Sequence, residues 1–172
     1  MDRNDFVTYA HHNRWANGRL YDACAALPDA AYFAPRPAAF FGSLHRTLNH
    51  ILVGDRAWMH RMSGEGPDPD SLDQELFSAF APLRQARQAE DERILDFVAA
   101  LAPADFDRVV AYRTLLGEDH ANPLRQLLAH LFNHQTHHRG QAHALVMEAG
   151  DQPPALDLIY YLREETATRS KP

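Results

Sequence analysis

The stretch from Asn122 to Gly150, NPLRQLLAHLFNHQTHHRGQAHALVMEAG, decides the fold. Asn122 is a typical N-cap residue, and the proline after it suits the first turn of a helix, where its missing N–H has no partner to lose. Gly150 suits the position just after a helix, where the backbone turns left-handed. We therefore predict a helix from Pro123 to Ala149.

The apolar side chains of this helix fall on one side. At about 100° per residue, seven of them share an arc roughly 100° wide that should face a core. They are Leu124, Leu127, Leu128, Leu131, Ala142, Leu145 and Val146. His134 and His138 lie inside this arc, whereas His130 and His137 lie outside it. Inward histidines four residues apart can bind one metal ion, and the alternative is a core pair that hydrogen-bonds without metal.

Three earlier segments also carry apolar side chains at helical spacing. We predict helices from about Asn4 to Leu27, from the N-cap Ser43 to Met62, and from Leu76 to Leu101, with Pro82 as an alternative start for the third. Between Pro103 and Pro123, Val and Tyr alternate around short polar breaks, which indicates a small β-hairpin.

The end of the chain adds a short helix. We predict it from Leu156 to Glu164, followed by a polar tail, residues 166–172, that frays. The sequence therefore predicts an all-α fold, a four-helix bundle with a short extra C-terminal helix and a small β-hairpin before the last bundle helix. Residues 1–172 are expected to form a single domain.

Composition narrows the functional classes. The chain has 172 residues, 45% of them hydrophobic and 23% charged, as folded domains do. A net charge of −6 and the lack of a basic run count against nucleic-acid binding. No apolar run reaches the roughly 18 residues of a membrane span. The single cysteine, Cys24, lies in an apolar stripe as a core residue, and the N-terminus resembles no signal peptide, so we expect a cytoplasmic protein.

A third ligand would complete a metal site with the two inward histidines. The second predicted helix offers His45, His50 and His60, and helical periodicity does not choose among them. Asp55 lies in the apolar stripe of the same helix, where burying an unpaired carboxylate is costly. We therefore expect Asp55 to be ion-paired, hydrogen-bonded or close to the metal.

Three blocks of the sequence resemble the DinB family of bacterial proteins, which is distinct from the DNA polymerase that shares its name. They are HNRWANGRL at residues 12–20, LNHILVGDRAWMHRM at residues 48–62 and LFNHQTHHRGQ at residues 131–141, in the order that the family has. LLGEDHANPL and DLIYYLRE extend the resemblance toward the C-terminus. The similarity therefore spans nearly the whole chain.

This resemblance implies a metal site made of His50, His134 and His138. The family binds a divalent ion, nickel or zinc, with one histidine of the second bundle helix and an HxxxH pair of the fourth. Three neutral nitrogens leave a coordination position free for water or substrate, as in catalytic zinc sites. His137 is then a bystander or a neighbour of a ligand.

Asp55, Asn13 and Asn17 are candidates to accept hydrogen bonds from the ligand histidines. For the two asparagines the alternative is hydrogen bonding between helices.

Two functions are consistent with such a site. The first is a metal-dependent enzyme on a small-molecule substrate, either a thiol S-transferase with a low-molecular-weight thiol cosubstrate, as the family's relatives imply, or a hydrolase. The second is a non-catalytic bundle that binds a metal or small ligand in a stress response. A ferritin-like di-iron protein is excluded, because paired Glu-x-x-His motifs are absent. The resemblance also implies a homodimer, for which exposed apolar residues of the second and third helices could supply the surface.

Overall fold

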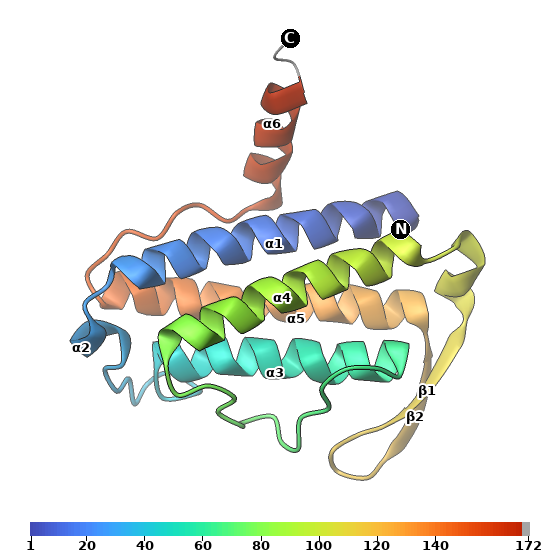
Figure 1. Cartoon of the computed structure of the whole chain (residues 1–172), viewed down its shortest axis with the longest axis horizontal. Helices are drawn as coiled ribbons and strands as arrows, with labels where there is room; N and C mark the ends of the chain where they lie inside the picture. The colour runs from blue at the N-terminus through green and yellow to red at the C-terminus, as the bar shows by residue number, and fades with distance from the viewer. Residues whose placement is uncertain (170–172) are drawn as a thin grey trace.

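A computed structural model describes residues 1–169, and its four long helices pack side by side as a bundle (Figure 1). The bundle helices are α1 (Arg3–Ala26), α3 (Leu44–Ser63), α4 (Phe80–Ala100) and α5 (Leu124–Glu148). α5 contacts α1 and α3, and α4 contacts the same two helices. The predicted all-α bundle is therefore confirmed.

Most helix ends lie where the capping residues predict them. The Ser43 hydroxyl accepts a hydrogen bond from the backbone N–H of Arg46 at the start of α3. Gly64 ends that helix with a φ of 75°, and Gly150 follows α5 with a φ of 98°. Glycine adopts these left-handed conformations without the strain that a side chain would add.

The segment between α4 and α5 forms the predicted hairpin. A short 3-10 helix, η1 (Pro103–Asp107), leads into strands β1 (Val109–Arg113) and β2 (Asp119–Pro123), which pair antiparallel. Figure 1 shows this hairpin extending from one end of the bundle. The hairpin leads directly into α5, the helix that carries the histidine pair.

Two predicted helix starts are wrong. α4 begins at Phe80 rather than Leu76, and Pro82 lies in its first turn, where a missing N–H costs no hydrogen bond. Asn122 does not cap α5, because it lies in β2 and accepts a hydrogen bond from the Tyr112 hydroxyl at 3.1 Å. The Asn122 side chain, which the sequence predicts as the helix cap, is therefore hydrogen-bonded to Tyr112 of the opposite strand.

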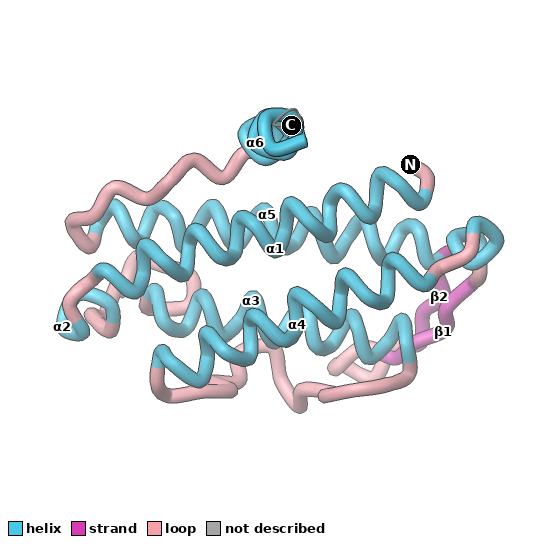
Figure 2. The backbone as a smooth tube through the Cα atoms, turned by 45° about the horizontal axis from the view of Figure 1, so that its top comes forward, coloured by secondary structure: helices cyan, strands magenta, loops and turns pink. Residues whose placement is uncertain are grey.

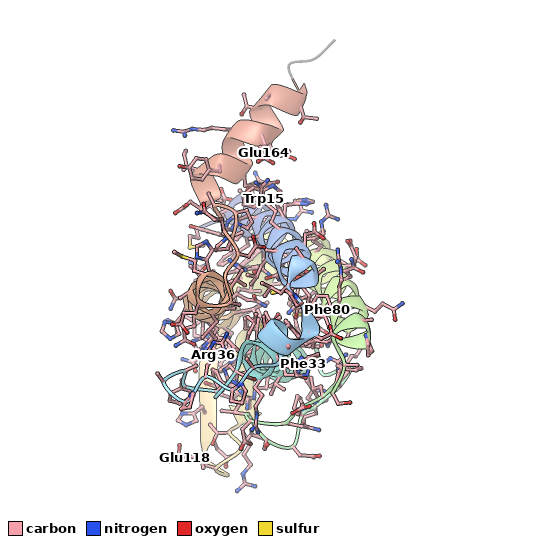
Figure 3. The ribbon with its side chains drawn as sticks, turned by 90° about the vertical axis from the view of Figure 1, so that its left-hand side faces the viewer. Trp15, Phe33, Arg36, Phe80, Glu118 and Glu164 are labelled. Carbon is pink, nitrogen blue, oxygen red and sulfur yellow. The ribbon has the colours of Figure 1, made fainter. Side chains whose placement is uncertain are left out.

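Two helices lie outside the bundle. α2 (Asp29–Tyr32) is a single turn within a segment for which the sequence predicts no helix. α6 (Leu158–Arg169) projects away from the bundle (Figures 1 and 2). Glu164 anchors it, since its carboxylate accepts a hydrogen bond from Trp15 Nε1 at 2.8 Å (Figure 3).

α6 differs from its predicted range of Leu156–Glu164 at both ends. It begins at Leu158, because the carbonyl oxygen of Leu156 is bound by the His12 ring instead of by the helix. It continues to Arg169 and so includes residues 166–169 of the tail that we expected to fray. Residues 170–172 of that predicted tail lie outside the described residues.

The core has two apolar ends and a polar middle. One cluster, next to the hairpin, contains Phe6, Ile94 and Leu128, and the other contains Leu20 and Leu48. Between these clusters every bundle helix contributes buried polar side chains. This polar layer consists of Asn13 and Asn17 of α1, Asp55 of α3, Arg87 and Asp91 of α4, and Gln135 and Arg139 of α5.

Cys24 lies buried in the second apolar cluster, which confirms it as a core residue. Along residues 1–169, none of the helices combines the length and the apolar character that a membrane crossing requires.

Candidate metal centre

α3 and α5 bring three histidines together. His50 lies on α3, and His134 and His138 lie one turn apart on α5. One ring nitrogen of each lies within 4.8 Å of the other two. His50 Nε2 and His138 Nε2 are 3.3 Å apart. Two nitrogens at about 2.0–2.1 Å from one tetrahedral zinc ion would be about 3.3–3.4 Å apart, so this pair has the spacing of a metal site.

Hydrogen bonds at Nδ1 fix the tautomers of two of these rings. His50 Nδ1 lies 2.8 Å from the carbonyl oxygen of Leu72, which can only accept, so this nitrogen carries the proton. His138 Nδ1 donates in the same way to Gln141 Oε1 at 2.8 Å. The neutral rings therefore point two bare Nε2 lone pairs at each other, an unfavourable arrangement that a shared cation would make favourable. Metal-bound histidines commonly have such Nδ1 partners.

His134 is held neutral by its surroundings. Burial is the largest cause that lowers its pKa, and together with the nearby His138 and His50 rings it brings the pKa to about 3. Burial is also the main cause that lowers the pKa of His50 and of His138. Among the described residues, His134 Nδ1 has no hydrogen-bond partner. All three rings are therefore neutral at pH 7, the form in which histidine binds metals.

Gly54 makes room for the His134 ring. A Cβ atom at this position of α3 would lie 2.5 Å from Cε1 of His134 and 3.1 and 3.2 Å from its two nitrogens. Any side chain there would displace the ring. Sequence reasoning missed Gly54, although a glycine inside a helix costs about 0.5–1 kcal/mol relative to alanine and so calls for a packing reason.

The loop between α2 and α3, residues 33–43, covers one side of the three histidines. Phe41 stacks on the His50 ring with centroids 4.0 Å apart, and its ring meets that of His138 at 5.4 Å. A cavity of about 440 Å³ lies beside them, lined in part by His50, Phe41, Arg46 and Asn49. Figure 3 shows Phe33 and Arg36 of the same loop at this end of the bundle. A small molecule could reach His50 through this cavity.

The other histidines of α5 stay outside the cluster. His130 packs its ring against Trp58, with centroids 4.6 Å apart. His137 is exposed, and its Nε2 lies 3.4 Å from the amide nitrogen of Gln141, the residue that holds His138. His137 is therefore linked to the predicted ligand His138 by hydrogen bonds that both make to Gln141.

The remaining candidates on α3 have partners elsewhere. The His45 ring hydrogen-bonds the Tyr32 hydroxyl at 2.9 Å and the Phe77 carbonyl at 2.8 Å. His60 Nδ1 hydrogen-bonds the Gly66 carbonyl at 3.1 Å. Of the three histidines that periodicity left open on this helix, the structure places only His50 beside His134 and His138.

Asp55 is ion-paired, as one of its predicted alternatives states. Its carboxylate pairs with Arg87 of α4 and accepts a hydrogen bond from the Gln135 amide. The prediction that it accepts from a ligand histidine is wrong. Five residues separate it from His50, which turns the two side chains about 140° apart around the helix.

Asn13 and Asn17 form hydrogen bonds between helices, so their prediction as partners of the ligand histidines is wrong. Asn17 Nδ2 donates to Asp91 at 2.9 Å, and Asn13 Nδ2 donates to the same carboxylate at 3.4 Å. Both amide oxygens accept from Arg139 Nη1. α1 contacts α4 and α5 within the polar layer, and a loop carbonyl and an α5 amide hold the histidines instead.

Comparison with known proteins gives two matches. The model of the DinB family matches residues 1–170. Protein DinB of Bacillus subtilis (strain 168) is 26% identical over 166 residues, which cover 88% of this chain and 90% of that protein. The family match extends across all four bundle helices and all three clustered histidines.

Proposed function

This chain belongs to the DinB family, and from that membership and its histidine cluster we propose that it is a divalent-metal-dependent enzyme acting on a small molecule. The observation that carries the proposal is the 3.3 Å approach of the bare Nε2 atoms of His50 and His138. His134 would be the third ligand. Imidazole nitrogens suit zinc and nickel, and we propose one such ion per chain.

The ion would lower the pKa of a bound thiol or water so that a nucleophile forms at neutral pH. Other residues of the chain orient the histidine rings. The Leu72 carbonyl and the Gln141 amide fix the rings of His50 and His138. Phe41 shields the face of the His50 ring, and the adjacent cavity admits the substrate.

We propose thiol S-transfer as the reaction, with a low-molecular-weight thiol as cosubstrate. The chain has one thiol of its own, Cys24, which is buried in the core and has its pKa raised by burial to about 12. A sulfur nucleophile would therefore come from a second molecule. We also propose a cytoplasmic location, where such thiols are kept reduced. Hydrolysis, with water as the nucleophile, is the alternative reaction.

Metal content is the first test. Untagged protein, purified without chelators or a nickel column, should contain about one zinc or nickel ion per chain by elemental analysis. The His134→Ala, His138→Ala double variant should retain its circular dichroism spectrum and lose the metal. His60→Ala serves as the control, because His60 lies outside the cluster. Negligible metal in the wild-type protein, even after incubation with either ion, would refute the proposal.

Thiol use is tested separately on cobalt-loaded protein. A thiol that takes the free coordination position should add a sulfur-to-cobalt charge-transfer band in the near ultraviolet. Thiols that give the band are then screened for transfer to electrophiles. If the protein binds metal but shows neither the band nor hydrolysis of small esters and amides, it is the non-catalytic binder considered above.

A further inference from the structure

A second and larger cavity lies between α1 and α5. Its volume is about 830 Å³. Its third wall is the linker between α5 and α6, which runs back along the bundle (Figure 2). Tyr9, Ala129, Phe132 and Leu156 give it a largely apolar lining. None of the three clustered histidines lines it, so it is separate from the candidate metal centre.

The linker between α5 and α6, residues 149–157, is held against the bundle by two histidines. His12 Nε2 lies 2.8 Å from the carbonyl oxygen of Leu156, and His143 Nε2 lies 3.2 Å from that of Pro154. Because a carbonyl can only accept, both nitrogens act as donors. The cavity is therefore closed on this side by hydrogen bonds from both α1 and α5, as expected of a preformed ligand site.

A buried cation lines the same cavity. Arg139 of α5 is only 3% exposed. Its Nη1 donates to neutral amide oxygens of the polar layer, and its Nη2 donates to the Thr136 hydroxyl at a long 3.4 Å. Within residues 1–169 no carboxylate oxygen lies within ion-pair distance of Arg139. Arg87, by contrast, pairs directly with Asp55 and Asp91.

Arg139 therefore has no directly bound anion among the described residues, and the charges of Asp91 and Asp55 reach it only at longer range. A buried guanidinium without a direct carboxylate partner is unfavourable, and a carboxylate can accept two parallel hydrogen bonds from it. The lining also contains polar side chains, among them Asn133 and Thr136, but its larger apolar part suits a hydrocarbon body. The exposed carboxylate of Asp157 also lines the cavity and would repel any anion there, so a single carboxylate held directly by Arg139 is favoured over a dianion.

We propose that this cavity binds a small amphipathic monocarboxylate, with its carboxylate on Arg139 and its apolar body between Tyr9, Phe132 and Leu156. The site is independent of the proposed enzyme function, since it shares no residue with the histidine cluster. Metal content and ligand binding therefore succeed or fail separately.

Calorimetric titration of the full-length protein with decanoate tests the proposal. 1-Decanol and decyltrimethylammonium have the same chain with no charge and with the opposite charge. Decanoate should bind at least about tenfold more tightly than 1-decanol, as expected of a charged hydrogen bond. Decyltrimethylammonium should bind weakest. Equal affinity for decanoate and 1-decanol, or no binding of decanoate, would overturn the proposal.

Variants locate the site. Arg139→Gln should reduce decanoate affinity about tenfold or more and leave 1-decanol affinity nearly unchanged. Arg125→Gln, on the same helix but paired with Asp107 outside the cavity, should change neither. Because Arg139 is buried in the polar layer, its variant must first show the wild-type circular dichroism spectrum and a cooperative thermal transition.

A second variant covers the case in which Arg139→Gln does not fold. Ala129 is half-buried on the cavity wall, and Ala129→Trp should fill the space and weaken decanoate and 1-decanol alike. If decanoate binds this folded variant as tightly as the wild type, the ligand lies elsewhere and the proposal is wrong.

Discussion

Gly54 and His134 show how strongly the candidate metal centre depends on one missing side chain. Gly54→Ala would place a methyl group 2.5 Å from the His134 ring, so the ring must move. We expect metal affinity to fall at least about tenfold, the loss that follows when a ligand is misplaced. A competition titration with a chelator measures this loss.

The matched control is Gly18→Ala in α1, where a Cβ would meet no atom within 4 Å. It should leave metal affinity unchanged and raise the free energy of unfolding by about 0.5–1 kcal/mol, because alanine favours the helix. Wild-type metal affinity in Gly54→Ala would show that the ring does not occupy the space described.

His134 also predicts how the stability of metal-free protein depends on pH. The pKa of this ring is about 3 in the folded chain, whereas in the unfolded chain it has the ordinary histidine value of 6.5. Between these values the unfolded chain binds a proton that the folded chain does not, so stability falls as the pH falls from 6.5 toward 3.

Urea unfolding of metal-free protein at pH 6.5 and pH 4.5 measures the effect. The wild type should lose about 1 kcal/mol more than His134→Gln over this interval, since each pH unit contributes up to about 1.4 kcal/mol and the ring is partly solvated. Equal losses in the two proteins would mean that His134 titrates normally.

α4 is joined to its neighbours by Arg87, whose guanidinium pairs with Asp55 of α3 and lies 3.0 Å from Asp91 of α4 itself. All three side chains are buried. Burial raises the pKa of Asp55 to about 7 even though the attraction of Arg87 opposes that rise. The helix therefore depends on this cation to keep two carboxylates inside the bundle.

Arg87→Ala should destabilise the protein by about 3–5 kcal/mol, because it leaves buried carboxylates without their cation. Arg84→Ala, three residues earlier on α4, removes only a partly exposed ion pair with Asp22 and should cost at most about 1 kcal/mol. Urea unfolding at pH 7 compares the two. Similar losses in both variants would show that the buried pair has no special role.

Across the molecule, large apolar side chains are exposed in a different place from the one that the sequence suggested. Those of α3 and α4 are buried or half-buried, whereas Ile159, Tyr160 and Leu162 of α6 are exposed. The run LIYYL puts apolar groups on every side of α6, which is typical of a helix that becomes buried. We therefore expect a homodimer in which a second copy covers α6.

Sedimentation velocity at micromolar concentration tests this expectation. The wild type should sediment as a dimer, and the Ile159→Glu, Leu162→Glu double variant should sediment as a monomer. Leu116→Glu, at the more exposed tip of the hairpin, should remain a dimer. A monomeric wild type, or a dimeric double variant, would contradict the predicted role of α6.

The sequence alone determined which segments form the four bundle helices and which of their faces turn inward. Apolar spacing and capping residues act within a few residues of each other, so local chemistry predicts α3 with its Ser43 cap and the end of α5 at Gly150. The inward orientation of His134 and His138 follows from the same spacing. Family resemblance was needed to select His50.

Only the tertiary structure decided what stands opposite each inward side chain. A helical wheel gives a direction about one axis, but not the neighbour that lies there. Arg87 as the partner of Asp55, Gly54 as the space for His134 and the cavity beside Arg139 each join different helices. These partners are distant in sequence, and packing of the helices sets their contacts.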